Sequence, residues 1–174
     1  MKKHGQKDSR GGNAEVGQQY AALPWRDKGG LEILLVTSRE TRRWVIPKGW
    51  PMKNKKPHAA AAREALEEAG VTGRVVKRPI GAYSYIKRLK NGAPLQCSVD
   101  VFPLKVTGHL NRWPEQGERT GHWFSVEEAA EAVEEPELQA LIRGFAEHVA
   151  ADALRKKGKK ALEAVSAPAA ESQG

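Results

Sequence analysis

Three glutamates stand within five residues in the segment AAAAREALEEAGV, which begins at Ala59. On a helix that turns about 100° per residue, the side chains of Glu64, Glu67 and Glu68 fall within about 100° of arc. The helix would therefore turn three carboxylates outward together. The opposite face, which we expect to pack on a sheet, holds Ala62, Ala65, Leu66 and Ala69.

Clustered carboxylates of this kind suit a hard divalent cation. Like charges three or four residues apart on a helix repel each other, whereas Mg²⁺ or Mn²⁺ accepts oxygen ligands from carboxylates and phosphates together. A loop with Lys53, Lys55 and Lys56 directly precedes the helix and would hold the phosphates. The alternative is a solvated acidic face tied to these lysines, and the helix alone leaves both interpretations open.

The positive charge of the chain is concentrated in one segment and at the two ends. The 174 residues carry a formal net charge of +8. Residues 39–56 hold seven basic side chains and one acidic one, whereas residues 1–12 and 155–174 carry +3 each. The local patch indicates an anionic ligand, and the basic ends are expected to aid solubility or to bind polyanions weakly.

The stretch from Gly49 to Val71 resembles the signature box of the Nudix hydrolases, Gly-x5-Glu-x7-Arg-Glu-U-x-Glu-Glu-x-Gly-U, in which U is a bulky aliphatic residue. Two positions depart from the box: Lys55 replaces its first Glu, and Ala65 is a small residue at the first U. The segments WVIPKG (44–49) and WFSVEEA (123–129) are similar to the family's flanking strands, so the resemblance covers roughly residues 18–150. The matching residues are Gly49, Arg63, Glu64, Glu67, Glu68, Gly70 and Val71.

The resemblance implies a reaction and a role for each matched residue. Glu64, Glu67 and Glu68 would bind the catalytic Mg²⁺ or Mn²⁺, with the backbone carbonyl of Lys48 as a further ligand. One of the glutamates would serve partly as a base for the attacking water, and Arg63 would orient a carboxylate. The reaction would be hydrolysis of a phosphoanhydride, in which the metal activates water and neutralises charge on the phosphoryl oxygens.

Lys55 changes one expectation that the family would otherwise give. The first Glu of the box supports its loop by pairing with the Arg of the box, and a lysine would instead repel Arg63. We therefore expect Arg63 to pair within its own helix, for example with Glu67 four residues later. Lys55 would then extend the phosphate patch or remain a solvent-exposed loop lysine.

Two segments narrow the substrate. TSRETRRWVIPKG (37–49) and RTGHWFSVEEA (119–129) resemble the diphosphoinositol polyphosphate and diadenosine polyphosphate branch of the family. This resemblance predicts an anionic, highly phosphorylated small molecule as the substrate, although any one of the basic residues alone would also suit an ordinary surface. The residues expected to bind the substrate are Ser38, Arg39, Arg43, Lys48, Lys53, Lys55 and Arg119.

Acidic and aromatic residues near these segments are further candidates. Family members often carry an acid that completes the metal site or acts as base, and Glu115 and Glu118 precede the strand HWFS. Of these two acids, Glu118 is our candidate for the base. Trp44 and Trp50 flank the basic loop, and they would either stack on a nucleobase or belong to the core.

Two other functions remain open. An RNA 5′-end pyrophosphohydrolase would suit the basic ends of the chain, but the sequence has no aromatic-rich platform for single strands, so nucleic acid is the less favoured partner. A non-catalytic sensor of a phosphorylated ligand is the second alternative. The three intact glutamates argue against the sensor.

The elements that must position these residues mix strands with helices. Pro24 limits the first strand to a sheet edge or a bulge. The order of elements predicts the α/β (mixed α+β) class, as a Nudix-like α/β/α sandwich with a mixed β-sheet between helices. The expected strands are 18–25, 31–38, 44–49, 73–89, 95–106 and 122–125, and the expected helices are 58–69, 125–133 and 136–154.

One domain is expected, over residues 17–155. It would lie between a disordered basic N-terminal tail (1–16) and a disordered C-terminal tail (156–174). The single cysteine, Cys97, and the lack of a secretory signal pattern predict a cytoplasmic protein. No apolar run approaches the length of a membrane span, so we expect no membrane partner. We expect a monomer or a homodimer.

Overall fold

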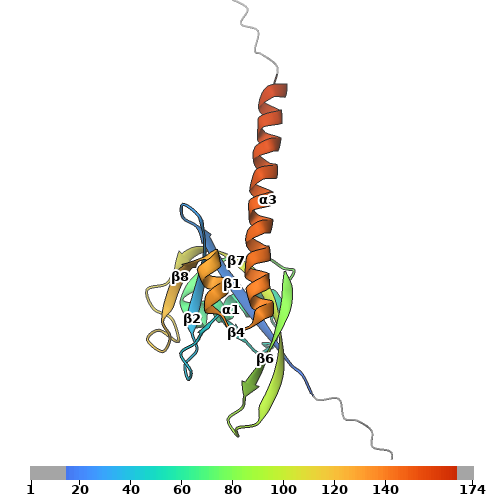
Figure 1. Ribbon diagram of the computed structural model, residues 1–174. Coiled ribbons are helices and arrows are strands. Elements are labelled where there is room, and N and C mark those ends of the chain that lie inside the picture. The colour runs from blue at the N-terminus through green and yellow to red at the C-terminus, as the bar shows by residue number, and fades with distance from the viewer. Residues whose placement is uncertain (1–14, 168–174) are drawn as a thin grey trace, which may run out of the picture.

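The structure is a computed structural model, and it describes residues 15–167 of the chain. Strands and helices mix along the chain as the sequence predicts (Figure 1). The elements are β1 (Gly17–Asp27), β2 (Leu31–Thr37), β3 (Trp44–Val45), β4 (Lys48–Gly49), α1 (Pro57–Ala69), β5 (Val71–Val75), β6 (Gly81–Arg88), β7 (Pro94–His109), β8 (Gly121–Ser125), α2 (Val126–Ala132) and α3 (Pro136–Ser166).

All of these strands belong to one mixed sheet. Its main order is β3-β2-β1-β7-β5, with β4 paired to β1, β6 to β7 and β8 to β2. β1 and β7 pair in parallel, from Gly17 opposite Cys97 to Trp25 opposite Lys105. The other strand pairings are antiparallel. The sheet is therefore mixed, as the sequence predicts.

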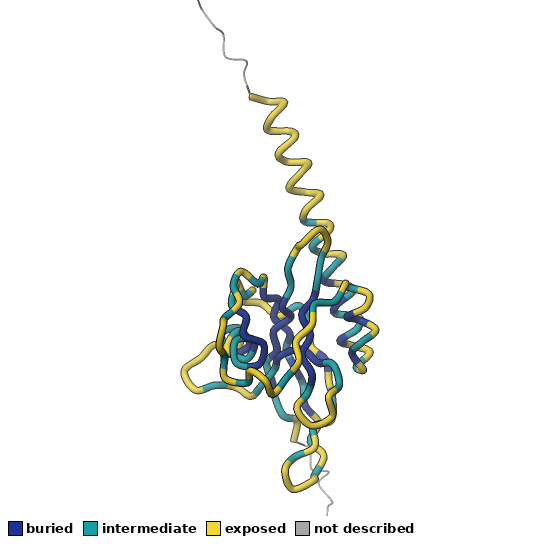
Figure 2. The backbone as a smooth tube through the Cα atoms, turned by 90° about the vertical axis from the view of Figure 1, so that its left-hand side faces the viewer, coloured by how far each residue is buried: buried dark blue, intermediate teal, exposed yellow. Residues whose placement is uncertain are grey.

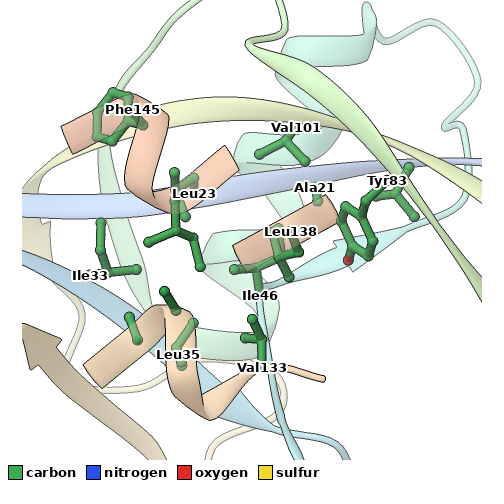
Figure 3. Close-up of a cluster of buried hydrophobic side chains, with 14 residues drawn as sticks. Ala21, Leu23, Ile33, Leu35, Ile46, Tyr83, Val101, Val133, Leu138 and Phe145 are labelled. Atoms are coloured by element: carbon green, nitrogen blue, oxygen red, sulfur yellow. The ribbon is translucent and has the colours of Figure 1, made fainter. Parts of the chain in front are cut away.

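Helices cover both faces of this sheet, which confirms the predicted α/β/α sandwich. On one face, Leu23, Ile33 and Leu35 of β1 and β2 belong to the same buried cluster as Leu138 and Phe145 of α3 (Figure 3). On the other face, α1 packs against β1, β2 and β7. The buried residues lie in the middle of the sandwich, between the sheet and these helices (Figure 2).

Helix α1 has the predicted ends and part of the predicted buried face. Pro57 occupies its first turn, and Gly70 ends it with φ of 68°, a left-handed conformation that glycine adopts without strain. Ala65 and Ala69 lie on the buried face as the helical wheel predicts, and Ala62 packs partly buried against the same cluster, but the prediction that Glu68 points outward is wrong. The buried residues are Ala60, Ala61, Ala65, Glu68 and Ala69.

Of the two alternatives predicted for Pro24, a sheet edge or a bulge, the edge is wrong because β1 is a central strand of the sheet. β1 pairs with β2 only from Trp25 to Asp27, and with β4 only at Tyr20 and Ala21. Pro24 therefore stands where β1 changes its partner on that side. A missing N–H donor costs no ladder hydrogen bond at this position.

The C-terminal helices also follow the predicted starts. Ser125 Oγ accepts from the N–H of Glu128 in the expected capping box. Helix α3, however, continues to Ser166, so residues 156–166 are helical where we expected a disordered tail. This segment is rich in Ala, Lys, Leu and Glu, which are strong helix formers.

The remaining tail predictions fall on residues 1–14 and 168–174, which lie outside the described residues. In residues 15–167, no helix has both the length and the apolar character that a membrane crossing requires.

Candidate active site

Glu64 lies directly against the backbone of β4. Lys48 and Gly49 form this short strand by pairing with β1. A Cβ atom built on Gly49 would be 2.0 Å from Glu64 Oε1, so a glycine is needed for the carboxylate to approach this closely. Burial, followed by the charges of Glu67 and Glu115, raises the pKa of Glu64 to about 7.

Glu68 is the buried member of the three box glutamates, with a side chain that is 7% exposed. Its Oε1 lies 3.4 Å from Nη2 of Arg119, which is itself 10% exposed. Burial raises the pKa of Glu68, and the positive charges of Arg119 and Lys48 oppose this shift. Arg119 also donates to the carbonyl oxygen of Thr37 at 3.2 Å, while its buried Nε has no partner among the described residues.

Glu115, in the loop between β7 and β8, adds a fourth carboxylate to Glu64, Glu67 and Glu68. We call these four residues the acidic cluster. Its N–H donates to the carbonyl oxygen of Glu67 at 3.0 Å, which fastens the loop to the end of α1. Its Oε1 lies 3.4 Å from Arg119 Nη2 and 3.2 Å from Arg39 Nη1. Glu118 is half exposed, and its only ion pair within the described residues is with Arg39, at 3.7 Å. The structure therefore brings Glu115 to the cluster rather than Glu118, a choice for which the sequence offers no motif.

Arg63 and Glu67 form the expected pair within α1. Arg63 Nε donates to Glu67 Oε1 at 2.7 Å, which confirms the prediction made from the lysine at position 55. Lys55 and Arg63 line one cavity of about 230 Å³, and none of the three box glutamates lines it. Lys55 thus lines the same cavity as Arg63, which the three box glutamates do not line.

The side chain of Lys48 lies beside Tyr85 of β6. Its Nζ is 5.0 Å from the ring centroid of Tyr85, whose hydroxyl donates to Gln19 Oε1 at 2.6 Å. Burial lowers the pKa of Lys48, and the negative charge of Glu68 opposes this shift. No acceptor within residues 15–167 forms a hydrogen bond or ion pair with the ammonium group. The ammonium group is therefore buried without a paired carboxylate among the described residues.

The loop from Ser38 to Arg43 is held by its own hydrogen bonds. The Ser38 N–H donates to the Arg43 carbonyl oxygen at 2.9 Å, and the Ser38 hydroxyl bonds to Thr41 Oγ1 at 2.6 Å. The guanidinium of Arg43 reaches Glu135 Oε1 at 2.6 Å, at the start of α3. The structure thus gives Ser38 and Arg43 partners within the protein and does not bring Arg43 to the acidic cluster.

The remaining candidates lie at the surface or in the core. Lys53 is exposed in the loop before α1. Trp44 packs edge to face on Phe124, with ring centroids 5.0 Å apart, so it belongs to the core. Trp50 is 41% exposed and rests on Gly17, where an added Cβ atom would be 3.0 Å from its ring.

The donors of the acidic cluster fit a hard divalent cation, because all of them are carboxylate oxygens and Glu64 lies directly against the β4 backbone. Within the described residues, however, no three His, Cys, Asp or Glu side chains are already arranged to hold a metal. Glu67 bonds to Arg63, and Glu68 and Glu115 face Arg119. A cation bound here would therefore take over carboxylates that arginines now neutralise.

Comparison with known proteins gives consistent relatives. The model of the NUDIX domain family matches residues 18–145. The Arabidopsis thaliana protein "Nudix hydrolase 12, mitochondrial" is 34% identical over 118 residues, which cover 66% of this chain and 58% of that protein. The Mus musculus protein "Diphosphoinositol polyphosphate phosphohydrolase 3-alpha" is 33% identical over 120 residues, or 67% of this chain and 69% of its own. The chain thus spans less than two thirds of the first of these relatives.

Solved structures share the fold. A crystal structure of C. elegans Ap4A hydrolase superposes with a TM-score of 0.55 and 22% identity, covering 78% of this chain and 99% of that one. The Nudix domain of Shewanella oneidensis NrtR, solved with ADP ribose, gives a TM-score of 0.57 at 11% identity over 76% of this chain and 90% of that one. At these identities the likeness establishes the fold alone.

Proposed function

This chain belongs to the NUDIX domain family, and from that premise we propose that it is a divalent-metal-dependent hydrolase of phosphoanhydride bonds. The proposed cofactor is Mg²⁺ or Mn²⁺. The proposed substrate is a highly phosphorylated small molecule, such as a diphosphoinositol polyphosphate or a diadenosine polyphosphate.

The contact between Glu64 and Gly49, with Glu68 buried beside it, carries the proposal. Burial raises the pKa of both carboxyl groups, and the charge of Glu64 adds to the shift at Glu68. Placing such groups together is unfavourable without a partner of opposite charge. A cation at this position would offset that cost, and a glycine at residue 49 leaves the carboxylate room to approach the β4 backbone.

Four groups of the chain would hold the metal: the carboxylates of Glu64, Glu67 and Glu68, and the carbonyl oxygen of Lys48. When bound, the ion supplies Lewis-acid activation of water and neutralises charge on the phosphoryl oxygens. Arg63 would keep the Glu67 carboxylate oriented through their 2.7 Å hydrogen bond.

Arg39 and Arg119 would bind the phosphates next to the reacting bond. Both lie on Glu115, and Arg39 is 57% exposed, so a phosphate oxygen can reach its guanidinium. Glu115 itself would accept the proton of the attacking water. It is preferred to Glu118 because its backbone is fastened to the end of α1 and its charge acts on Glu64.

Two kinds of support favour a highly phosphorylated substrate. The side chains of Lys48 and Lys53 offer positive charge that no carboxylate of the described residues pairs with. The mouse relative carries diphosphoinositol polyphosphate in its name. A substrate with several phosphates could bind these lysines through its additional phosphates, whereas a substrate with a single diphosphate would have no phosphate left to contact them.

A substrate panel tests the proposal. The full chain is incubated with Mg²⁺ or Mn²⁺ and, separately, a diphosphoinositol polyphosphate, diadenosine polyphosphates, nucleoside triphosphates and 5′-triphosphorylated RNA, and products are separated by ion-exchange chromatography. The highest kcat/KM is expected on one of the first two classes. A preference for the RNA would overturn the substrate proposal, and binding without any product would favour a sensor.

A matched pair of variants tests the site. Glu68→Gln is expected to lower kcat by about 100-fold or more, because metal ligands and their supports carry effects of that order. Glu147→Gln, an equal change on the exposed surface of α3, is expected to leave kcat unchanged. Equal rates for both variants would show that the metal site lies elsewhere.

A further inference from the structure

The last turns of α3 leave the domain. Leu138, Ile142 and Phe145 are buried against the sheet, but every residue from Ala153 to Ser166 is exposed. This part of α3 extends beyond the sandwich as a single helix (Figures 1 and 2). No other segment within residues 15–167 covers any side of it.

The exposed end of α3, residues 150–166, separates apolar from charged side chains. With Leu154 set at 0° and about 100° per residue, the arc from about −40° to 80° contains no charged residue. Its largest members are Leu154, Leu162 and Val165, which are 69%, 76% and 87% exposed. The other members of this apolar stripe are Ala150, Ala151, Gly158 and Ala161.

The rest of this helix surface is basic. Five cations fall between about 100° and 300° on the same wheel, against two acids. One of them, Arg155, pairs with Asp152. The others have no ion pair with any described residue and are Lys156, Lys157, Lys159 and Lys160.

We propose that residues 150–166 dock on the surface of an anionic lipid bilayer, with the helix lying in the plane of the interface. A bilayer offers anionic headgroups to the lysines and an apolar layer to the stripe, so one surface satisfies both faces of the helix. The expectation of no membrane partner rests on the lack of a spanning segment, and it does not consider a helix that lies in the plane of the interface. Docking is independent of the hydrolase site, because no residue of the segment lies in the acidic cluster.

Two other occupants fit the helix less well. A nucleic acid would neutralise the lysines but leave Leu154 and Leu162 in water. A second copy of the chain, packed along the stripe, would bring two lysine-rich faces side by side around a seam made largely of alanine and Gly158. A nucleic acid would leave the apolar stripe exposed to water, and a second copy would bring like charges together.

Vesicle co-sedimentation of the full chain tests the proposal. We expect binding to vesicles of phosphatidylglycerol and phosphatidylcholine, little binding to phosphatidylcholine alone, and weakening in high salt. Replacing Lys156, Lys157 and Lys159 with Gln should lower the affinity by about tenfold or more. The matched control replaces Arg74, Lys77 and Arg78 with Gln, which removes the same charge from an exposed segment elsewhere, and should bind like the wild type.

The apolar stripe has its own test. Leu154→Ser with Leu162→Ser keeps every charge and should also weaken vesicle binding, with circular dichroism confirming that the helix persists. In separate proteins, Leu162→Cys and Lys156→Cys are labelled with an environment-sensitive dye. The emission of the dye at position 162 should shift to the blue on anionic vesicles, and that at position 156 should not.

Three results would overturn the proposal. They are no binding of the wild type to anionic vesicles, equal losses in the charge variant and its control, and unchanged binding after the two leucine substitutions. If the variant with both leucines replaced also binds RNA as the wild type does, the helix would be assigned to nucleic acid.

Discussion

Gly49 and Glu64 are in direct contact across the gap between β4 and α1, and a Cβ atom at residue 49 would come within 2.0 Å of the carboxylate oxygen. Gly49→Ala must therefore displace the far end of the Glu64 side chain. We expect metal affinity to fall by about tenfold or more, with the free energy of unfolding changed by no more than about 0.5 kcal/mol because the displaced atoms are flexible.

Isothermal titration with Mn²⁺ and thermal unfolding check this prediction. Gly121→Ala is the control, since a Cβ atom there would meet nothing closer than 3.7 Å. Equal metal affinity in the two variants would contradict it.

Glu115 and Glu118 lie three positions apart in the sequence but differ in exposure: the side chain of Glu115 is 18% exposed and that of Glu118 is 50% exposed. Glu115→Gln is expected to lower kcat by about 100-fold, as for a general base, and Glu118→Gln to change it by less than about twofold. Steady-state kinetics on the preferred substrate decides between them. The reverse order of the two effects would restore the base predicted from sequence.

Arg119 neutralises two carboxylates in the absence of metal. Arg119→Met leaves Glu68 and Glu115 without this partner and is expected to destabilise the metal-free protein by about 3 kcal/mol. Mg²⁺ should recover part of that loss, so the rise in Tm on adding Mg²⁺ should be larger in the variant than in the wild type. An exposed substitution, Arg74→Met, should show the wild-type rise. A smaller rise in Arg119→Met would mean that arginine and metal do not share these carboxylates.

Lys55 lines the same cavity as Arg63, and none of the three box glutamates lines it. Lys55→Glu would restore the residue type of the family box and place a negative charge beside Arg63. We expect a gain in unfolding free energy of about 0.2–1 kcal/mol, typical of an exposed ion pair. The KM should stay within about twofold. A large increase in KM would instead make Lys55 a substrate contact.

Cys97 is fully buried in β7, and burial raises the pKa of its thiol. Fewer thiolates are therefore present in the folded protein than in the unfolded chain at any pH below the raised pKa. Iodoacetamide at pH 8 should modify the native protein at least about 100-fold more slowly than the denatured protein, as followed by mass spectrometry. Comparable rates would show that β7 opens readily, and would also compromise single-site labelling of the α3 end.

Local patterns in the sequence were enough to place most elements of the fold. The glutamate helix, its glycine end and the capping box at Ser125 all depend on neighbours within four residues, and the structure has each of them. The Arg63–Glu67 pair followed in the same way, because residues four apart on a helix always lie close together.

Apart from the helical end of α3, which local helix propensity favours, the errors concern contacts between distant segments. A helical wheel cannot show that the Glu115 N–H bonds to the end of α1, or that Arg119 pairs with Glu68. Nor can it show that Arg43 meets Glu135, 92 residues later in the chain. The position of Pro24 in a central strand likewise depends on how two partner strands divide one side of β1.

The parallel pairing of β1 with β7 also delays the completion of the sheet while the chain is being synthesised. β1 ends at Asp27, and its parallel partner begins only at Pro94. At ribosomal rates of about 5–20 residues per second, the first strand waits roughly 3–13 s for that partner. Because so many sheet contacts join distant segments, folding should be slow. During synthesis, the apolar edge of β1 is the surface that a chaperone would need to shield.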